Sequence, residues 1–203
     1  MQVKVEERHR EYDGFFKLDI VDLRFERFDG KMSERVSRLV FERGDSAAVL
    51  LYDPQKDTVV LVEQFRYPAY DREGGEGRLL EVVAGTIRGA RSPEAVARAE
   101  ALEEAGYAVD ELEYLSTFYP SPGACTERIF LYLGYVSDAG RVGPGGGTPE
   151  SGEDIRVHEI LLDRALQLVK QGSIRDAKTI IALQYLALRG RQQESGTGAA
   201  NAE

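Results

Sequence analysis

Apolar and polar residues alternate near the start of the chain in a pattern that predicts paired strands. Between residues 15 and 28 the apolar positions 16, 18 and 20 give way to 21, 23 and 25, which indicates a strand with a bulge or a change of register. Asp29 and Gly30 form a hairpin signal, and residues 33–41 return as a second strand. These strands predict an antiparallel flap, whereas the charged residues 1–13 show no clear period and predict a frayed terminus.

The middle of the chain contains the short apolar runs expected of a buried sheet. Strands are predicted at 47–53, 58–65, 79–83, 113–119, 128–136 and 153–162, and helical spacing follows at 163–171 and 176–188. Two loops are expected, a flexible one at 71–77 and a glycine-rich one at 140–152, and loops of the second kind are usually functional or disordered. From residue 189 the chain is polar and low in complexity, so we expect a disordered tail.

A further helix, predicted over residues 93–105, is rich in glutamates. Ser92 is a suitable N-cap, and Gly106 is the left-handed cap position that glycine takes without strain. Glu100 and Glu104 lie four residues apart on one face, with Glu103 beside them. Because like charges at this spacing repel, the three side chains are either exposed to water or neutralised by a cation. The helix alone leaves both interpretations open.

Composition narrows the class of protein. The 203 residues suffice for one sizeable core, and the net charge of −9 argues against a nucleic-acid partner, which would require a basic face. A single cysteine, Cys125, rules out an internal disulfide and fits a reducing compartment. Since the apolar stretches are too short to cross a bilayer and the first residues lack a signal core, we expect a soluble, cytoplasmic protein without a membrane partner.

The segment from Gly85 to Tyr107 resembles the Nudix box, Gly-x5-Glu-x7-Arg-Glu-U-x-Glu-Glu-x-Gly-U, where U is apolar. Two positions depart from it, because Arg91 replaces the first Glu and Ala99 replaces the Arg. Replacing both members of a supporting pair can be nearly neutral, whereas removing one leaves an unpaired charge. Since the three helical glutamates remain, we expect a working site with altered support, and loss of activity is the alternative.

Other segments resemble the ADP-ribose pyrophosphatase branch of the Nudix hydrolases, and the likeness covers residues 14–187. They include Glu63-Gln64-x-Arg66, Ala69-Tyr70-Asp71, Ser121-Pro122-Gly123 and Glu153-Asp154-Ile155-Arg156. The resemblance implies an α/β fold, an α/β/α sandwich on a mixed sheet after an N-terminal antiparallel β-subdomain. It divides the chain into a subdomain for dimerisation and substrate contact (1–45), a hydrolase domain (46–188) and the tail (189–203). It also implies a homodimer.

The same resemblance implies a Mg²⁺ site, with Mn²⁺ as an alternative cation. The implied ligands are one carbonyl and two carboxylates, those of Ala84, Glu100 and Glu104, with Glu103 as a further ligand or a group behind them. An acid from the loop before residue 154 completes the site. We assign Glu153 to the metal and Glu150 to the general base, although the two roles could be reversed.

Residue chemistry supports this assignment, since a diphosphate resists attack by water until hard cations screen its oxygens. A carboxylate base that takes the proton contributes typically about 10²–10⁴-fold in rate. The resemblance also implies substrate contacts from Phe15, Arg38, Arg66, Gly123 and Glu127. Without the resemblance, Phe15 is expected in the core and the two arginines at the surface.

We therefore predict metal-dependent hydrolysis of the diphosphate bond of ADP-ribose, giving AMP and ribose 5-phosphate. The box does not recognise the base or the sugar, so another nucleoside diphosphate sugar such as GDP-mannose is an alternative substrate. A non-catalytic protein that binds nucleotide sugars is an alternative from a different class. The retained glutamates count against it, because binding alone does not require a metal-ligand helix with a candidate base.

Overall fold

The computed structural model describes residues 1–203 except 110, 149–151 and 199–203, and it does not describe the side chains of 190–198. The chain forms two compact units, residues 1–45 with 118–128 and residues 46–117 with 129–203. The segment 118–128, which the sequence assigned to the second domain, belongs to the first unit. The reason is backbone pairing, because Phe41 accepts from the N–H of Thr126 and donates to the carbonyl of Ala124.

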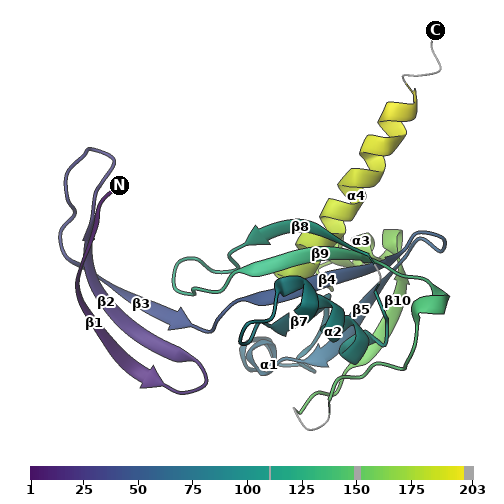
Figure 1. Ribbon diagram of the computed structural model, residues 1–203, viewed down its shortest axis with the longest axis horizontal. Coiled ribbons are helices and arrows are strands. Elements are labelled where there is room, and N and C mark those ends of the chain that lie inside the picture. The colour runs from purple at the N-terminus through teal and green to yellow at the C-terminus, as the bar shows by residue number, and fades with distance from the viewer. Residues whose placement is uncertain (110, 149–151, 199–203) are drawn as a thin grey trace. The chain divides into compact units, whose positions relative to one another are not determined.

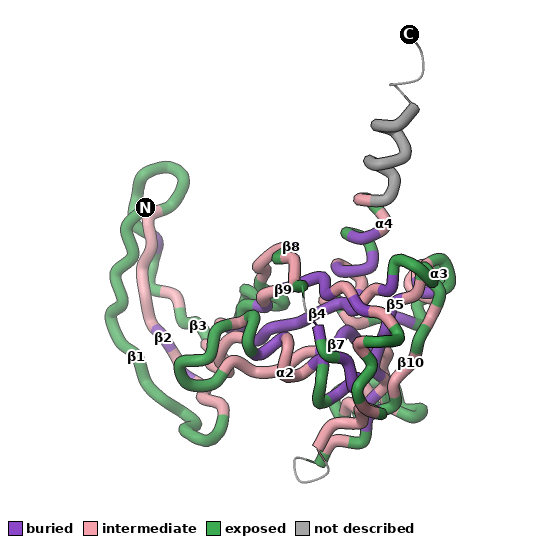
Figure 2. The backbone as a smooth tube through the Cα atoms, turned by 45° about the vertical axis from the view of Figure 1, so that its right-hand side comes forward, coloured by how far each residue is buried: buried purple, intermediate pink, exposed green. Residues whose placement is uncertain are grey.

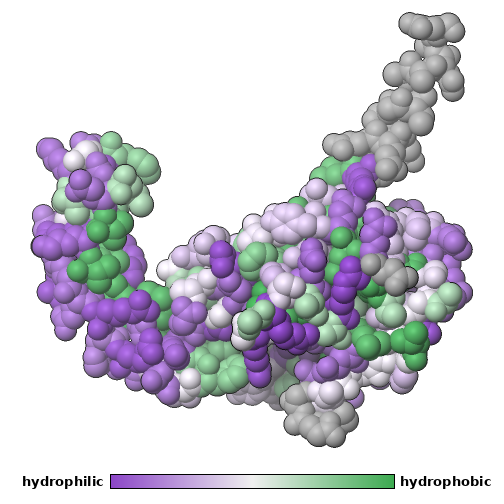
Figure 3. All heavy atoms as spheres, viewed as in Figure 1, coloured by the Kyte–Doolittle hydropathy of each residue, from purple (hydrophilic) through white to green (hydrophobic). Residues whose placement is uncertain are grey.

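The first unit contains an antiparallel sheet of order β1-β2-β3, formed by β1 (Val3–Asp13), β2 (Lys17–Phe25) and β3 (Val36–Glu42). The prediction of a frayed terminus at residues 1–13 is wrong, since residues 3–13 form β1, which is exposed along its whole length (Figure 2). β1 is held by its ladder with β2 and by Arg8 and Arg10, which both donate to the buried Asp19. Figure 3 shows largely hydrophilic residues on the visible face of this unit.

A mixed sheet forms the centre of the second unit, in the order β10-β5-β4-β9-β8, with β6 paired to β5 and β7 paired to β4 (Figure 1). The β4–β9 pair is parallel, whereas β4 pairs antiparallel with β5 and β7. The strands are β4 (Ser46–Asp53), β5 (Thr58–Phe65), β6 (Arg78–Glu81), β7 (Val83–Thr86), β8 (Leu112–Phe118), β9 (Ile129–Tyr135) and β10 (Arg156–Leu161).

Helices cover both faces of this sheet, which confirms the predicted α/β/α sandwich. Residues 46–51 of β4 are all buried, so both of its alternating rows of side chains lie against other elements. One row packs with α2 (Pro93–Ala105) through Val96 and Ala101, and α4 (Ala177–Gly198) packs on β4 and β9. The remaining helices are α1 (Tyr67–Glu73), the 3₁₀ turn η1 (Asp138–Gly140) and α3 (Leu162–Lys170).

Two helices differ from the sequence expectation. The loop expected at 71–77 is partly helical, because Pro68 stands in the first turn of α1 and Gly74 ends it. The tail expected to be disordered from residue 189 is helical as far as Gly198, and residues 199–203 lie outside the described part. Among the helices that the structure describes, none combines the length and apolar character needed to cross a bilayer.

Candidate active site

Helix α2 begins and ends where its capping residues predict. The Ser92 hydroxyl accepts the Ala95 N–H at 3.2 Å, and Pro93 follows in the first turn, where its missing N–H costs nothing. At the other end Gly106 is left-handed, with φ of 77°, and its N–H donates to Leu102 at 3.1 Å. The helix is therefore fixed at both termini, and its glutamates have a rigid support.

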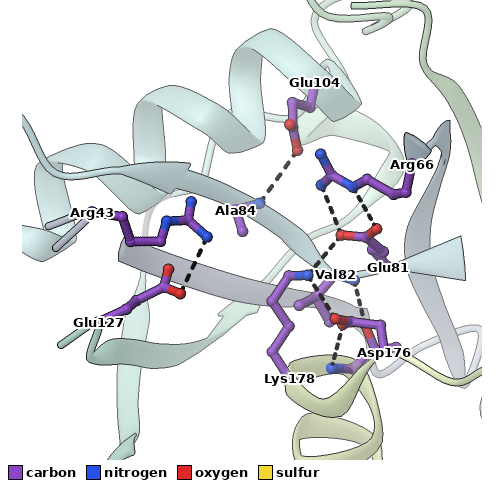
Figure 4. A network of polar contacts seen from close by, with 10 residues as sticks. Arg43, Arg66, Glu81, Val82, Ala84, Glu104, Glu127, Asp176 and Lys178 are labelled. Carbon is purple, nitrogen blue, oxygen red and sulfur yellow. Dashed lines mark hydrogen bonds and ion pairs between the residues drawn. The ribbon is translucent and has the colours of Figure 1, made fainter. Parts of the chain in front are cut away.

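Two of these glutamates face the backbone of β7. A Cβ atom at Gly85 would lie 2.1 Å from Oε1 of Glu100, so a side chain at this position would displace the Glu100 carboxylate. One turn further along α2, Glu104 accepts the Ala84 N–H at 3.3 Å (Figure 4). Glu104 is only 4% exposed, which excludes the interpretation of its carboxylate as part of a solvated helix face.

Two glutamates of α2, Glu100 and Glu104, have raised pKa values. Burial, followed by the charge of Glu100, raises the pKa of Glu104 to about 8, against a weaker opposing effect of the Ala84 N–H. Burial also raises the pKa of Glu100, with contributions from Glu103 and Glu153. The positive charges of Arg66, Arg88 and Arg91 therefore offset the cost of ionising these glutamates only in part.

The glycine-rich loop docks against the C-terminal end of α2. The N–H groups of Gly146 and Gly147 donate to the carbonyls of Glu104 and Glu103 at 2.9 and 3.2 Å. A Cβ atom at Gly145 would lie 2.4 Å from the Glu104 carbonyl oxygen, which explains why this position is a glycine. The loop thus supplies hydrogen bonds to carbonyls that the helix end leaves unpaired.

This docking brings Glu153 to the end of α2. Its Oε2 accepts the Thr148 N–H at 2.9 Å, and the Thr148 hydroxyl donates to Glu103 at 3.2 Å. The charge of Glu153 contributes to the raised pKa of both Glu100 and Glu104, so the structure brings together four of the predicted acids. Glu150, the predicted general base, lies outside the described residues.

The chemistry of these donors fits a hard divalent cation. Carboxylate oxygens and a backbone carbonyl are the ligands that Mg²⁺ prefers, and buried acids with raised pKa values are neutralised by such an ion. Within the described residues, however, no three acidic, His or Cys side chains converge as a finished metal site. A cation therefore requires the glutamate side chains to reorient around it.

The two positions that depart from the resembled motif do not leave a buried unpaired charge. Arg91 is exposed and its guanidinium donates to the Ala95 carbonyl at 3.2 Å. Its charge, together with that of Arg88, opposes the increase in the pKa of Glu100. Position 99, an alanine, requires no partner.

Arg66 is held by an acid that the sequence analysis did not select. Its Nε and Nη2 atoms donate to the two oxygens of Glu81 at 2.8 and 2.9 Å, and Lys178 donates to Glu81 at 2.6 Å (Figure 4). Burial raises the pKa of Glu81, but the hydrogen bonds and charges of Arg66 and Lys178 outweigh it and lower the pKa to about 2. In the sequence, Glu81 is the one charged residue inside the apolar run 79–83, and this position could have indicated a buried acid with a charged partner.

Two predicted substrate residues are exposed on the first unit. Phe15 is 68% exposed, and its ring packs edge-on against Phe16 with 4.7 Å between centroids. Its assignment to the core is therefore wrong, and its stacking role stays a prediction. Arg38 is exposed and donates to the Ser37 carbonyl at 3.0 Å.

The other two predicted residues of that unit differ in exposure. Glu127 is 6% exposed and accepts from Arg43 at 3.2 Å, so its carboxylate is engaged within the unit. Gly123 is exposed, and a Cβ there would meet no atom within 4 Å. Packing therefore does not require glycine at this position, and its contact with substrate stays a prediction.

A cavity in the second unit lies apart from the glutamates of α2. It has a volume of about 230 Å³ and is lined by residues of β5, β6 and β10 and of the segments that precede β6 and β10, among them Glu63, Arg78 and Arg156. None of the α2 glutamates lines it. The chemistry is therefore assigned from the carboxylates and not from this cavity.

Comparison with known proteins places the chain among characterised relatives. The NUDIX domain family matches residues 42–181. The chain is 44% identical over 186 residues to an ADP-ribose pyrophosphatase of Escherichia coli (strain K12), covering 92% of this chain and 88% of that protein. It is 39% identical over 178 residues to a GDP-mannose pyrophosphatase of Enterobacter sp. (strain 638), covering 88% and 91%. A solved ADP compounds hydrolase has the same fold, with a TM-score of 0.73 at 16% identity, covering 95% and 96%.

Proposed function

The chain belongs to the NUDIX domain family, and from this premise we propose that it hydrolyses the diphosphate bond of ADP-ribose to AMP and ribose 5-phosphate. It is a Nudix hydrolase, with relatives that act on nucleoside diphosphate sugars. The observation that carries the proposal is the buried Glu104 carboxylate beside Glu100 and against β7. Such a group binds a hard cation, and hydrolysis of a diphosphate needs one.

The proposed mechanism assigns a task to each acid. A divalent cation would be held by one backbone carbonyl and three carboxylates, those of Ala84, Glu100, Glu104 and Glu153. When bound, it would screen the phosphate charges and make a water easier to deprotonate. Glu150 or Glu153 takes the proton from the attacking water, and Glu103 supports these groups. The water oxygen bonds to one phosphorus, and the bridging oxygen leaves with the other phosphate. Arg66, fixed on Glu81, orients a phosphate.

The identity of the cation and the assembly are part of the proposal. Mg²⁺ suits the all-oxygen donor set, with Mn²⁺ as the alternative. A homodimer formed through the first unit is supported by its exposed apolar side chains, which include Val3, Val5, Tyr12 and Leu39. The first unit would also supply Phe15, Arg38 and Glu127 to the substrate. A cytoplasmic location is supported by the single free cysteine.

GDP-mannose is the second candidate substrate. It is favoured by the relative of that name at 39% identity over most of both chains. The acids of α2 and of the glycine-rich loop would act on the diphosphate, through the cation and the attacking water, in either case, so they do not discriminate between the two substrates. The choice between the two substrates therefore depends on the residues that contact the base and the sugar.

The test is AMP release from purified protein given ADP-ribose and Mg²⁺, beside an EDTA control and a panel of nucleotide sugars. We expect turnover that needs the metal and falls about 10–100-fold or more in Glu104→Gln. Glu94→Gln is the matched control, because it makes the same change at an exposed position of the same helix. Tight binding with no product from any nucleotide sugar would contradict the proposal and favour a non-catalytic binding protein.

A further inference from the structure

A buried polar network connects the start of α4 to the bend between β6 and β7 (Figure 4). Lys178 donates to Glu81 at 2.6 Å and to Asp176 at 2.9 Å, and the Thr179 hydroxyl donates to Asp176 at 2.5 Å. Thr179 is fully buried and Glu81 is 2% exposed. Because buried polar groups must satisfy one another, these residues form a single unit.

Val82 shows why the network lies at this position. The residues before it pair with β5 and those after it pair with β4, so the chain changes ladder partner at Val82. Its N–H falls outside both ladders and instead donates to the Thr179 hydroxyl at 2.8 Å. Val82 is 1% exposed, so without Thr179 this N–H would be buried and unpaired.

Two residues of α4 therefore bond two consecutive residues of the bend. Lys178 bonds the side chain of Glu81, and Thr179 bonds the backbone of Val82. On one side Glu81 holds Arg66 by two hydrogen bonds. On the other side Val82 leads directly into Ala84 and Gly85, whose backbone contacts Glu104 and Glu100. A small shift at the bend would move both the proposed phosphate-orienting group and the proposed metal-binding backbone.

We propose that Lys178 and Thr179 are positioning residues for hydrolysis, holding the β6–β7 bend so that Arg66, Ala84 and Gly85 keep their places in the active site. This inference rests on the proposed function, since it gives these residues a task in that reaction. A purely structural role for α4 would instead affect stability alone.

Thr179→Val separates the two roles. It keeps the shape of the side chain but removes the hydroxyl, whereas Thr179→Ser keeps the hydroxyl. Leu183→Val is the matched control, because it removes one methylene from a fully buried residue of the same helix, outside the network. Lys178→Met removes the ammonium group and keeps an apolar stem of similar length.

Three readouts are compared, namely kcat with ADP-ribose and Mg²⁺, affinity for Mn²⁺ by calorimetry without substrate, and hydrogen exchange of the amides of 82–86. We expect Thr179→Val and Lys178→Met to lose about 10–100-fold in kcat or metal affinity. Faster exchange at 82–86 should accompany the loss in Thr179→Val. Thr179→Ser should stay near the wild type, and Leu183→Val should lower only the melting temperature.

Equal kcat, metal affinity and exchange in Thr179→Val and Leu183→Val would overturn the positioning role. Failure of the proposed function is a different result, in which wild-type protein binds Mn²⁺ but hydrolyses no ADP-ribose. In that case weaker Mn²⁺ binding and faster exchange in Thr179→Val alone still support the positioning of the β6–β7 bend. Wild-type protein that neither binds metal nor hydrolyses ADP-ribose would overturn both proposals.

Discussion

At the scale of single residues, Glu104 determines the electrostatics of the site. Its carboxyl is buried beside Glu100 and within reach of the charge of Glu153, and the Ala84 N–H offsets only part of this cost. Without a cation the folded chain therefore favours the protonated form of Glu104. The same arrangement becomes favourable once a divalent ion replaces the proton.

The raised pKa of Glu104 predicts how the stability of the metal-free protein depends on pH. The ordinary value is 4.5 and the folded value is about 8, so between these the folded state binds more protons than the unfolded one. The contribution of Glu104 to the free energy of unfolding is full below about pH 4.5 and falls as pH rises to about 8, by at most about 1.4 kcal/mol per pH unit. Melting temperatures in EDTA should decline over this range in wild type and less in Glu104→Gln. Equal slopes would contradict the prediction.

Local sequence was sufficient to predict the roles of some residues around the site and insufficient for others. Ser92 and Gly106 were predicted as caps because capping depends on a few neighbouring residues. Glu81 and Lys178 were missed because they are 97 residues apart, and a lone lysine near a helix start is ordinarily exposed. Only the fold, which places α4 against the β6–β7 bend, makes that lysine part of a network.

At the scale of elements, β1 shows how a strand forms without an apolar face. Its residues are exposed throughout, so hydrophobic periodicity gave no signal, and it was expected to fray. Pairing with β2 and the ion pairs to Asp19 stabilise it instead. By contrast β4 and β5 were predicted almost to the residue, because continuous burial leaves continuous apolar runs. Helix α4 extends past its apolar residues, where the sequence predicted disorder.

The role of Asp19 in β1 can be tested by hydrogen exchange. Asp19 accepts from Arg8 and Arg10, and the hydrogen bonds of Arg10 and Arg8 lower its pKa to about 2. Asp19→Asn removes the charge that binds both arginines, so we expect the amides of β1 to exchange faster while those of β3 change little. The matched control is Asp22→Asn in the same strand, whose carboxylate bonds Arg35 and Ser37 instead. Unchanged exchange of β1 in Asp19→Asn would show that the ladder alone holds the strand.

At the scale of the whole molecule, the two units carry different parts of the proposed chemistry. The second unit contains the acids of α2, the glycine-rich loop and the network that supports β7. The first unit contains Phe15, Arg38 and Glu127, whose proposed contacts are with the substrate. Bond cleavage and substrate recognition are therefore expected to respond to substitutions in different parts of the chain.

Steady-state kinetics with ADP-ribose should separate these contributions. Phe15 is an exposed aromatic ring, and stacking of a base on such a ring is worth about 1–3 kcal/mol, so Phe15→Ala should raise KM by roughly 5- to 150-fold and change kcat little. Glu104→Gln should instead lower kcat, because its carboxylate would hold the cation that screens the reacting diphosphate. Phe28→Ala is the matched control, since Phe28 is fully exposed in the same unit and has no proposed contact. A KM for Phe15→Ala equal to that of Phe28→Ala would remove Phe15 from the recognition site, and nucleotide selectivity would then depend on other residues.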